Sequence, residues 1–80
     1  LALIQNPASK IQNSKLLLAQ GWDIQGRLQL SRGNAQMALT TWRQAAALYT
    51  QLTDLDRLTR NQINQAQALQ ALGLYSQAQK

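Results

Sequence analysis

Several residue types that commonly build reactive sites are missing from this chain. Its 80 residues include no Cys, no His, no Glu and no Phe, with one Pro and four Gly. Without Cys the chain forms neither disulfide bonds nor thiolate metal sites. Without His or Glu it lacks the usual general acids and bases, and three Asp supply its only carboxylate side chains. The composition therefore predicts no enzymatic activity, no metal site and no cofactor.

No long hydrophobic run is present either. The apolar runs, of which Leu16–Ala19 is one, are far shorter than the roughly 20 residues that a membrane-spanning helix needs. We therefore expect no membrane partner and a cytoplasmic location. Because the sequence starts and stops inside a helical pattern, we also expect a piece of a longer protein, for which a missing signal peptide carries little weight.

Acidic side chains are scarce, and the chain is strongly basic. Eight Lys and Arg stand against three Asp, which gives a formal net charge of +5 and a pI of about 10.5. Such a charge is typical of proteins that bind nucleic acid. The cations are nevertheless spread from Lys10 to Lys80 with no run of three, which favours a generic solvated surface. We keep a basic helical nucleic-acid-binding domain as an alternative function.

The remaining polar residues form no catalytic constellation. Asp54 and Asp56 are the only closely spaced carboxylates, and side chains two positions apart on a helix diverge. Their position suits the start of a helix, where a carboxylate interacts favourably with the helix dipole. The serines have no His to activate them, and Gly21, Gly26 and Gly33 follow no strand. We therefore expect neither a nucleophile, a phosphate loop nor a small-molecule substrate.

Apolar residues recur at intervals of three and four positions, which predicts that the chain is all-α. We expect one helix over residues 14–32, beginning at the N-cap Ser14. A second is expected over 35–52, a third over 54–72, and a truncated fourth from about residue 74. The residues expected to face the core are Leu17, Gly21, Ile24 and Leu28 in the first helix, Ala38, Trp42, Ala45, Tyr49 and Leu52 in the second, and Leu55, Leu58, Ala66, Leu69 and Leu72 in the third.

The turn signals repeat after 40 residues. The segment Gly33–Ala38 reads Gly-Asn-Ala-Gln-Met-Ala, and Gly73–Ala78 reads Gly-Leu-Tyr-Ser-Gln-Ala. In each copy, a Gly suited to a left-handed helix end precedes an Ala by five positions. A fixed period of this length is typical of stacked antiparallel helix pairs. We therefore divide the chain into a low-complexity linker or loop (1–13), a first repeat (14–53) and a truncated second repeat (54–80).

Six positions of the first copy match the spacing of a known helical repeat. They are Trp22, Gly26, Gly33, Ala38, Trp42 and Ala45, and the second copy contributes Gln62, Ala66, Gly73 and Ala78, with Gln62 in place of the aromatic. With this spacing the chain resembles the tetratricopeptide repeat (TPR) family. The segment 63–75 is also similar to repeat arrays of bacterial proteins that end in a CHAT domain, a caspase-like peptidase module. The resemblance implies an α-solenoid in which Trp22 and Trp42 pack in the interior instead of stacking on bases.

The TPR resemblance also implies a function and a binding face. Proteins of this family hold a partner protein or peptide on a concave surface built mainly from the first helix of each pair. By position, that surface would comprise Gln20, Asp23, Arg27, Leu30 and Ser31 in the first copy and Arg60, Ile63, Gln67, Gln70 and Ala71 in the second. Amides suit a peptide backbone, and Arg27 and Arg60 could take a carboxylate. We therefore expect a non-catalytic protein-interaction scaffold; a regulatory segment of a larger CHAT protease is a further alternative.

Overall fold

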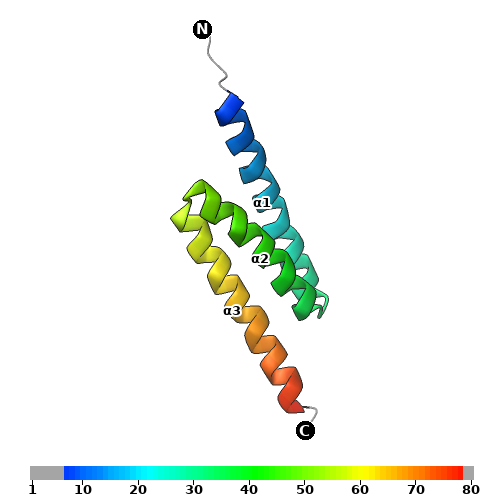
Figure 1. Cartoon of the computed structure of the whole chain (residues 1–80). Coiled ribbons are helices and arrows are strands. Elements are labelled where there is room, and N and C mark those ends of the chain that lie inside the picture. The colour runs from blue at the N-terminus through cyan, green and yellow to red at the C-terminus, as the bar shows by residue number, and fades with distance from the viewer. Residues whose placement is uncertain (1–6, 79–80) are drawn as a thin grey trace.

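The described part of the chain is helical apart from two short turns. The computed structural model describes residues 7–78, which form α1 (Pro7–Ser31), α2 (Ala35–Leu52) and α3 (Leu55–Ala78). No strand occurs within this range, which confirms the all-α prediction. The helices lie side by side in chain order, each antiparallel to the next, and α1 and α3 both pack on the shorter α2 (Figure 1).

The central helix α2 supplies most of the buried core. Its large aromatic side chains, Trp42 and Tyr49, have no exposed surface. Two clusters of buried residues surround them: Ala38, Leu39, Trp42 and Ala68 in one, and Ala19, Ala45 and Tyr49 in the other. The core face predicted for this helix is therefore buried as expected, except that Leu52 at its end is only half-buried. The aromatic residues fill the space on both sides of α2, because each neighbouring helix offers small side chains there.

Two backbone residues in the left-handed region make the turns. Gly33 has a φ of +85° and its N–H donates to the carbonyl of Leu30 at 2.9 Å, which ends α1 as expected. Thr53 follows α2 with a φ of 56°, a conformation that is unusual for a residue with a branched side chain. Asp54 then caps α3, because its Oδ1 accepts a hydrogen bond from the backbone N–H of Arg57 at 3.2 Å.

The outward face of α1 carries hydrophobic side chains that were predicted to lie in the core. Leu17, Ile24 and Leu28 are 69%, 54% and 51% exposed, so the predicted core face of this helix is wrong. The opposite face, which includes Ala19 and Gly26, packs on α2 instead. One reason is steric, since a Cβ at Gly26 would overlap the Trp42 indole. Larger residues of α1, namely Leu16, Trp22 and Leu30, are partly buried against the same clusters.

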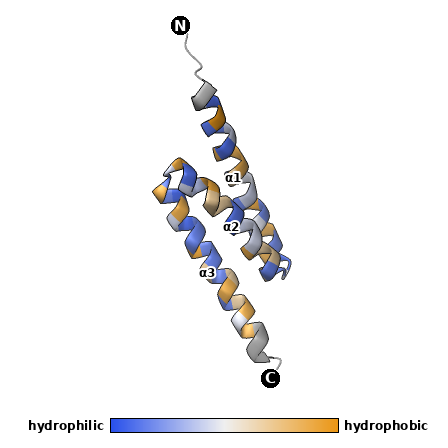
Figure 2. Cartoon of the chain, viewed as in Figure 1, coloured by the Kyte–Doolittle hydropathy of each residue, from blue (hydrophilic) through white to orange (hydrophobic). Residues whose placement is uncertain are grey.

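The outward face of α3 is uncovered in the same way. Leu55 and Leu69 are 66% and 50% exposed, and Ala66 is exposed as well, although all three were predicted to face the core. The face that α2 covers contains Asn61 and Ala68 instead. Hydrophobic segments, drawn in orange, alternate with hydrophilic ones, drawn in blue, along α1 and α3 (Figure 2). None of the helices within residues 7–78 has the length and apolarity needed to cross a bilayer.

The N-terminal end of the first helix differs from its prediction. α1 begins at Pro7 instead of Ser14, so residues 7–13 are helical and not a loop. A proline fits the first turn of a helix, where its missing N–H needs no partner, and the residues that follow contain no helix breaker. The rest of the predicted linker, residues 1–6, lies outside the described range, as do residues 79–80 at the other end.

The predicted fourth helix is absent from the described residues. α3 continues through Gly73 to Ala78, so Gly73 does not end a helix as Gly33 does. The backbone differs at the two glycines, since Gly33 has a φ of +85° whereas Gly73 has no positive φ and lies inside α3. Side-chain capping does not account for the difference, because Asn34 at the N-cap position of α2 makes no capping hydrogen bond with its side chain. A glycine inside a helix is tolerated at a modest energetic cost.

Candidate functional site

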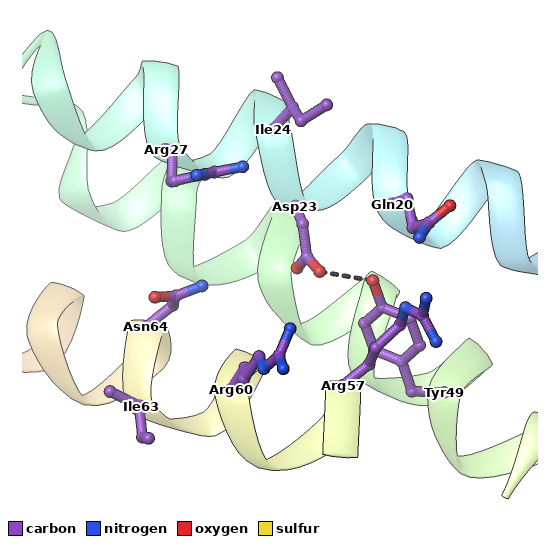
Figure 3. Close-up of a pocket in the computed structure, with 9 residues that line it drawn as sticks. All are labelled: Gln20, Asp23, Ile24, Arg27, Tyr49, Arg57, Arg60, Ile63 and Asn64. Carbon is purple, nitrogen blue, oxygen red and sulfur yellow. Dashed lines mark hydrogen bonds between the residues drawn. The ribbon is translucent and has the colours of Figure 1, made fainter. Parts of the chain in front are cut away.

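A groove with a volume of about 630 Å³ lies between α1 and α3. Nine residues line it: Gln20, Asp23, Ile24 and Arg27 from α1, Tyr49 from α2, and Arg57, Arg60, Ile63 and Asn64 from α3 (Figure 3). Their spacing of three and four positions places them along one side of each outer helix. Half of the predicted concave face therefore lines this groove, namely Gln20, Asp23, Arg27, Arg60 and Ile63.

Three arginines line the groove, and among the described residues Arg57 forms a salt bridge. Nη1 of Arg57 donates to Oδ2 of Asp54 at 2.7 Å, and this hydrogen-bonded ion pair lowers the pKa of Asp54 and raises that of Arg57. Arg27 and Arg60 are exposed and make no salt bridge within the described residues. Because they stand on opposite walls of the groove (Figure 3), one elongated ligand could contact both.

Asp23 lies between the two walls, but both of its carboxylate oxygens have partners. Oδ2 accepts a hydrogen bond from the Tyr49 hydroxyl, and Oδ1 accepts one from Nδ2 of Asn61 at 3.0 Å. The backbone carbonyl of Asp23 also accepts a hydrogen bond from Nε1 of Trp42 at 3.1 Å. A single residue of α1 thus joins all three helices. The sequence analysis assigned Asp23 to partner binding, whereas its contacts are those of a structural residue.

Asn61 completes this network, and the sequence analysis did not identify it. Its side chain has no exposed surface, and Nδ2 donates to the Trp42 carbonyl at 2.9 Å as well as to Asp23. Its Oδ1 accepts a hydrogen bond from Nε2 of Gln65 at 2.6 Å. A signal was available, since Asn61 falls three residues after Leu58 on the side of the helix that faces α2. A polar residue at such a position requires buried partners.

Tyr49 stays protonated to higher pH than a solvent-exposed tyrosine. Burial raises the pKa of its hydroxyl well above the usual range, and the hydrogen bond to Asp23 and the charge of that carboxylate raise it further. At neutral pH the hydroxyl is therefore a fixed hydrogen-bond donor. A protonated hydroxyl does not act as a base, and this one donates its hydrogen bond to the carboxylate of Asp23.

The other predicted contact residues lie outside the groove: Leu30, Ser31, Gln67, Gln70 and Ala71. Leu30 is half-buried and packs against the core, and with Ala71 it lines a separate cavity beside the α1–α2 turn. Gln67 and Gln70 are exposed on α3. Conversely, the sequence analysis missed four residues of the groove: Ile24, Tyr49, Arg57 and Asn64. Whether these four residues line the groove depends on how each helix is rotated about its own axis.

The positions that carry the TPR resemblance have different surroundings in the two copies. In the first copy, Gly26, Ala38, Trp42 and Ala45 are buried and Trp22 is half-buried. In the second copy, Gln62, Ala66 and Gly73 are exposed, and Ala78 is the last residue of α3. A shift of 40 residues thus relates a face of α1 that packs on α2 to a face of α3 that no described helix covers.

Comparisons of the chain with protein-family models, with curated proteins and with solved structures found no match. The resemblances to TPR and CHAT-associated arrays therefore stay predictions that rest on the residues quoted above. Within residues 7–78, no cluster of side chains has the composition needed to hold a metal ion.

Proposed function

We propose that the chain is a non-catalytic protein-interaction module that binds an extended acidic peptide in the groove between α1 and α3. One observation carries the proposal: the guanidinium groups of Arg27 and Arg60 stand on opposite walls without a salt-bridge partner among the described residues. A guanidinium presents five N–H donors and matches a carboxylate in a bidentate geometry. We also propose that the three helices correspond to one and a half helix pairs of a TPR-like solenoid.

The remaining lining of the groove suits a peptide main chain. Gln20 and Asn64 offer amide donors and acceptors to backbone N–H and C=O groups. Ile24 and Ile63 are both more than half exposed and offer apolar contact to side chains that alternate with the acidic ones. A groove with charged, amide and aliphatic residues along its length favours an extended ligand over a compact small molecule.

The chemistry of the groove supports a binding role over a catalytic one. Its carboxylate, Asp23, accepts hydrogen bonds at both oxygens, and its hydroxyl, that of Tyr49, is held in the protonated form. General acid–base catalysis requires a group that exchanges a proton near neutral pH. The Tyr49 hydroxyl does not meet this requirement. Both oxygens of Asp23 already accept hydrogen bonds, so Asp23 and Tyr49 hold the helices that position the arginines.

The proposal predicts a preference for acidic ligands. Fluorescently labelled peptides of equal length, one rich in Asp and Glu, one neutral and one basic, are titrated with the 80-residue chain, and binding is followed by anisotropy. We expect the acidic peptide to bind most tightly and its affinity to fall with added salt, because salt screens partly exposed ion pairs. Equal affinity for the acidic and the neutral peptide would contradict the proposal.

The alternative function is nucleic-acid binding. Two observations favour it: three arginines line one groove, and the net charge is +5. A random-sequence duplex included in the same titration separates the two. Phosphate contacts give an affinity that falls steeply with salt, in proportion to the number of counterions released. Tighter binding of the duplex than of the acidic peptide would replace our proposal. A role as a regulatory segment of a CHAT protease requires a CHAT domain in the same protein, which the gene sequence would show.

A further inference from the structure

α1 carries a second surface, on the side of the helix that faces away from α2. Four residues form it at intervals of four, three and four positions: Leu17, Gly21, Ile24 and Leu28, here called the outer stripe. The stripe adjoins the groove at Ile24, which also lines the groove. The three large side chains are each more than half exposed, and a Cβ at Gly21 would meet no atom within 4 Å. An exposed apolar stripe on a helix commonly marks a site of interaction.

The internal repeat identifies the kind of element that covers such a stripe. A shift of 40 residues maps the outer stripe onto Arg57, Asn61, Asn64 and Ala68 of α3. In α3, Asn61 and Ala68 of this face pack on α2, because both have no exposed surface and Asn61 donates to the carbonyl of Trp42. Arg57 and Asn64 lie at the edge of the same face and line the groove. The centre of this helix face is therefore covered by an antiparallel helix in one copy and open in the other.

We propose that the outer stripe binds an amphipathic helix, antiparallel to α1, that resembles α2 but carries smaller side chains opposite Leu28. The size condition follows from one difference between the copies, since α1 has Leu28 where α3 has Ala68. Ala68 is enclosed in one cluster with Leu39 and Trp42 of α2. A leucine in place of that alanine leaves too little room for both, because a well-packed interface does not accept three extra carbon atoms.

Three further differences between the copies make the outer stripe apolar throughout, since Leu17, Gly21 and Ile24 of α1 stand where α3 has Arg57, Asn61 and Asn64. At Gly21 the covering helix has no side-chain amide to satisfy. Without a side chain, this position also lets the backbone of a second helix come close. The site therefore selects a partner by shape and apolar area, whereas the groove between α1 and α3 selects by charge.

The test uses the 80-residue chain and two synthetic peptides. One peptide has the sequence of residues 34–53, and the other has the same sequence with Leu39→Ala. We expect the Leu39→Ala peptide to bind about tenfold more tightly than the unchanged peptide, although it is the less hydrophobic of the two. Leu28→Ala in the chain should remove this difference by admitting the unchanged peptide. Leu28 is more than half exposed, so its truncation leaves the core intact.

Two further variants locate the peptide. The double variant Leu17→Ala, Ile24→Ala should weaken binding by about tenfold or more, since each truncation removes two to three methyl or methylene groups from the contact. Arg27→Ala with Arg60→Ala should leave peptide affinity unchanged. The proposal is overturned if the unchanged peptide binds more tightly than the Leu39→Ala peptide. It is also overturned if the double variant binds the peptide as tightly as the unaltered chain does. A concentration-dependent dimer in sedimentation that the double variant abolishes also overturns it, because the stripe would then bind a second copy of the chain.

Discussion

A single carboxylate, that of Asp23, connects the three helices through its two side-chain oxygens. Tyr49 of α2 and Asn61 of α3 both donate to it, and the Trp42 indole donates to the backbone carbonyl of the same residue. A buried polar group without a hydrogen-bond partner lowers the stability of the fold by about 1–3 kcal/mol. Removal of one side chain of this network leaves its partners in that state. The network therefore fixes how α1 and α3 stand on α2, and with it the distance between the groove walls.

Removal of the Tyr49 hydroxyl should reveal this network as a pH dependence. The unfolded chain ionises Tyr49 near pH 10, while the folded chain holds the proton to higher pH because the pKa of Tyr49 is raised. The hydroxyl thus contributes stability that is complete below pH 10 and lost as the pH rises from there toward the folded pKa. Tyr49→Phe should cost about 1–3 kcal/mol at pH 7 and should flatten this alkaline decline.

Urea unfolding of both proteins between pH 7 and 11.5, followed by circular dichroism, measures the effect. Tyr75 remains in both proteins, so the difference between the two curves reports Tyr49 alone. If the free energies of unfolding of the two proteins declined in parallel above pH 10, the hydroxyl would not be held protonated by the fold.

Two glycines of α1 form a matched pair for testing the close approach of α1 and α2. A Cβ at Gly26 would overlap the indole of Trp42, which has no exposed surface, whereas a Cβ at Gly21 would meet no neighbouring atom. Gly26→Ala should therefore destabilise the fold by about 1–3 kcal/mol through overpacking. Gly21→Ala should stabilise it by up to about 1 kcal/mol through helix propensity. Thermal melts that shift in the same direction for both variants would contradict the packing described here.

At the scale of whole elements, the continuity of α3 is the feature that departs furthest from the repeat pattern. Gly33 has a positive φ and ends α1, whereas Gly73 lies inside α3 with open space around it. Gly33→Ala should cost about 1–2 kcal/mol, because a Cβ is disfavoured in the left-handed region. Gly73→Ala should instead stabilise the chain by up to about 1 kcal/mol. Equal destabilisation by the two substitutions, measured by urea unfolding, would place a turn at Gly73.

Helical periodicity alone predicted the number of complete helices and the core face of α2, but it could not assign the faces of α1. That helix has two apolar stripes, and the larger side chains, such as Leu17 and Leu28, belong to the exposed one. Large hydrophobic residues dominate a periodicity analysis, whereas the core face of α1 also contains small residues: Gly26 lies against the Trp42 indole and Ala19 packs with Tyr49. Only the partner helix decides between such stripes.

On the scale of the whole molecule, α2 lies between two outer helices that together carry two different surfaces. One is the groove, in which Arg27 and Arg60 make no salt bridge within residues 7–78, and the other is the apolar outer stripe of α1. Position within the repeat assigned Arg27 and Arg60 to one concave face, and both residues line the groove between α1 and α3. It could not predict that Asp23 is used structurally, because its partners Tyr49 and Asn61 are distant in sequence and meet it only in the folded chain.

The most direct measurement of the central claim is the affinity of the acidic peptide for three single variants of the chain. Arg27→Ala and Arg60→Ala should each weaken binding by about 1 kcal/mol, roughly fivefold in Kd, since each removes one charge-assisted contact. Arg43→Ala, which deletes an exposed cation of α2 outside the groove, should leave Kd nearly unchanged. Equal losses in all three variants would mean that only net charge matters, and no loss for Arg27→Ala and Arg60→Ala would mean that the groove does not bind the peptide.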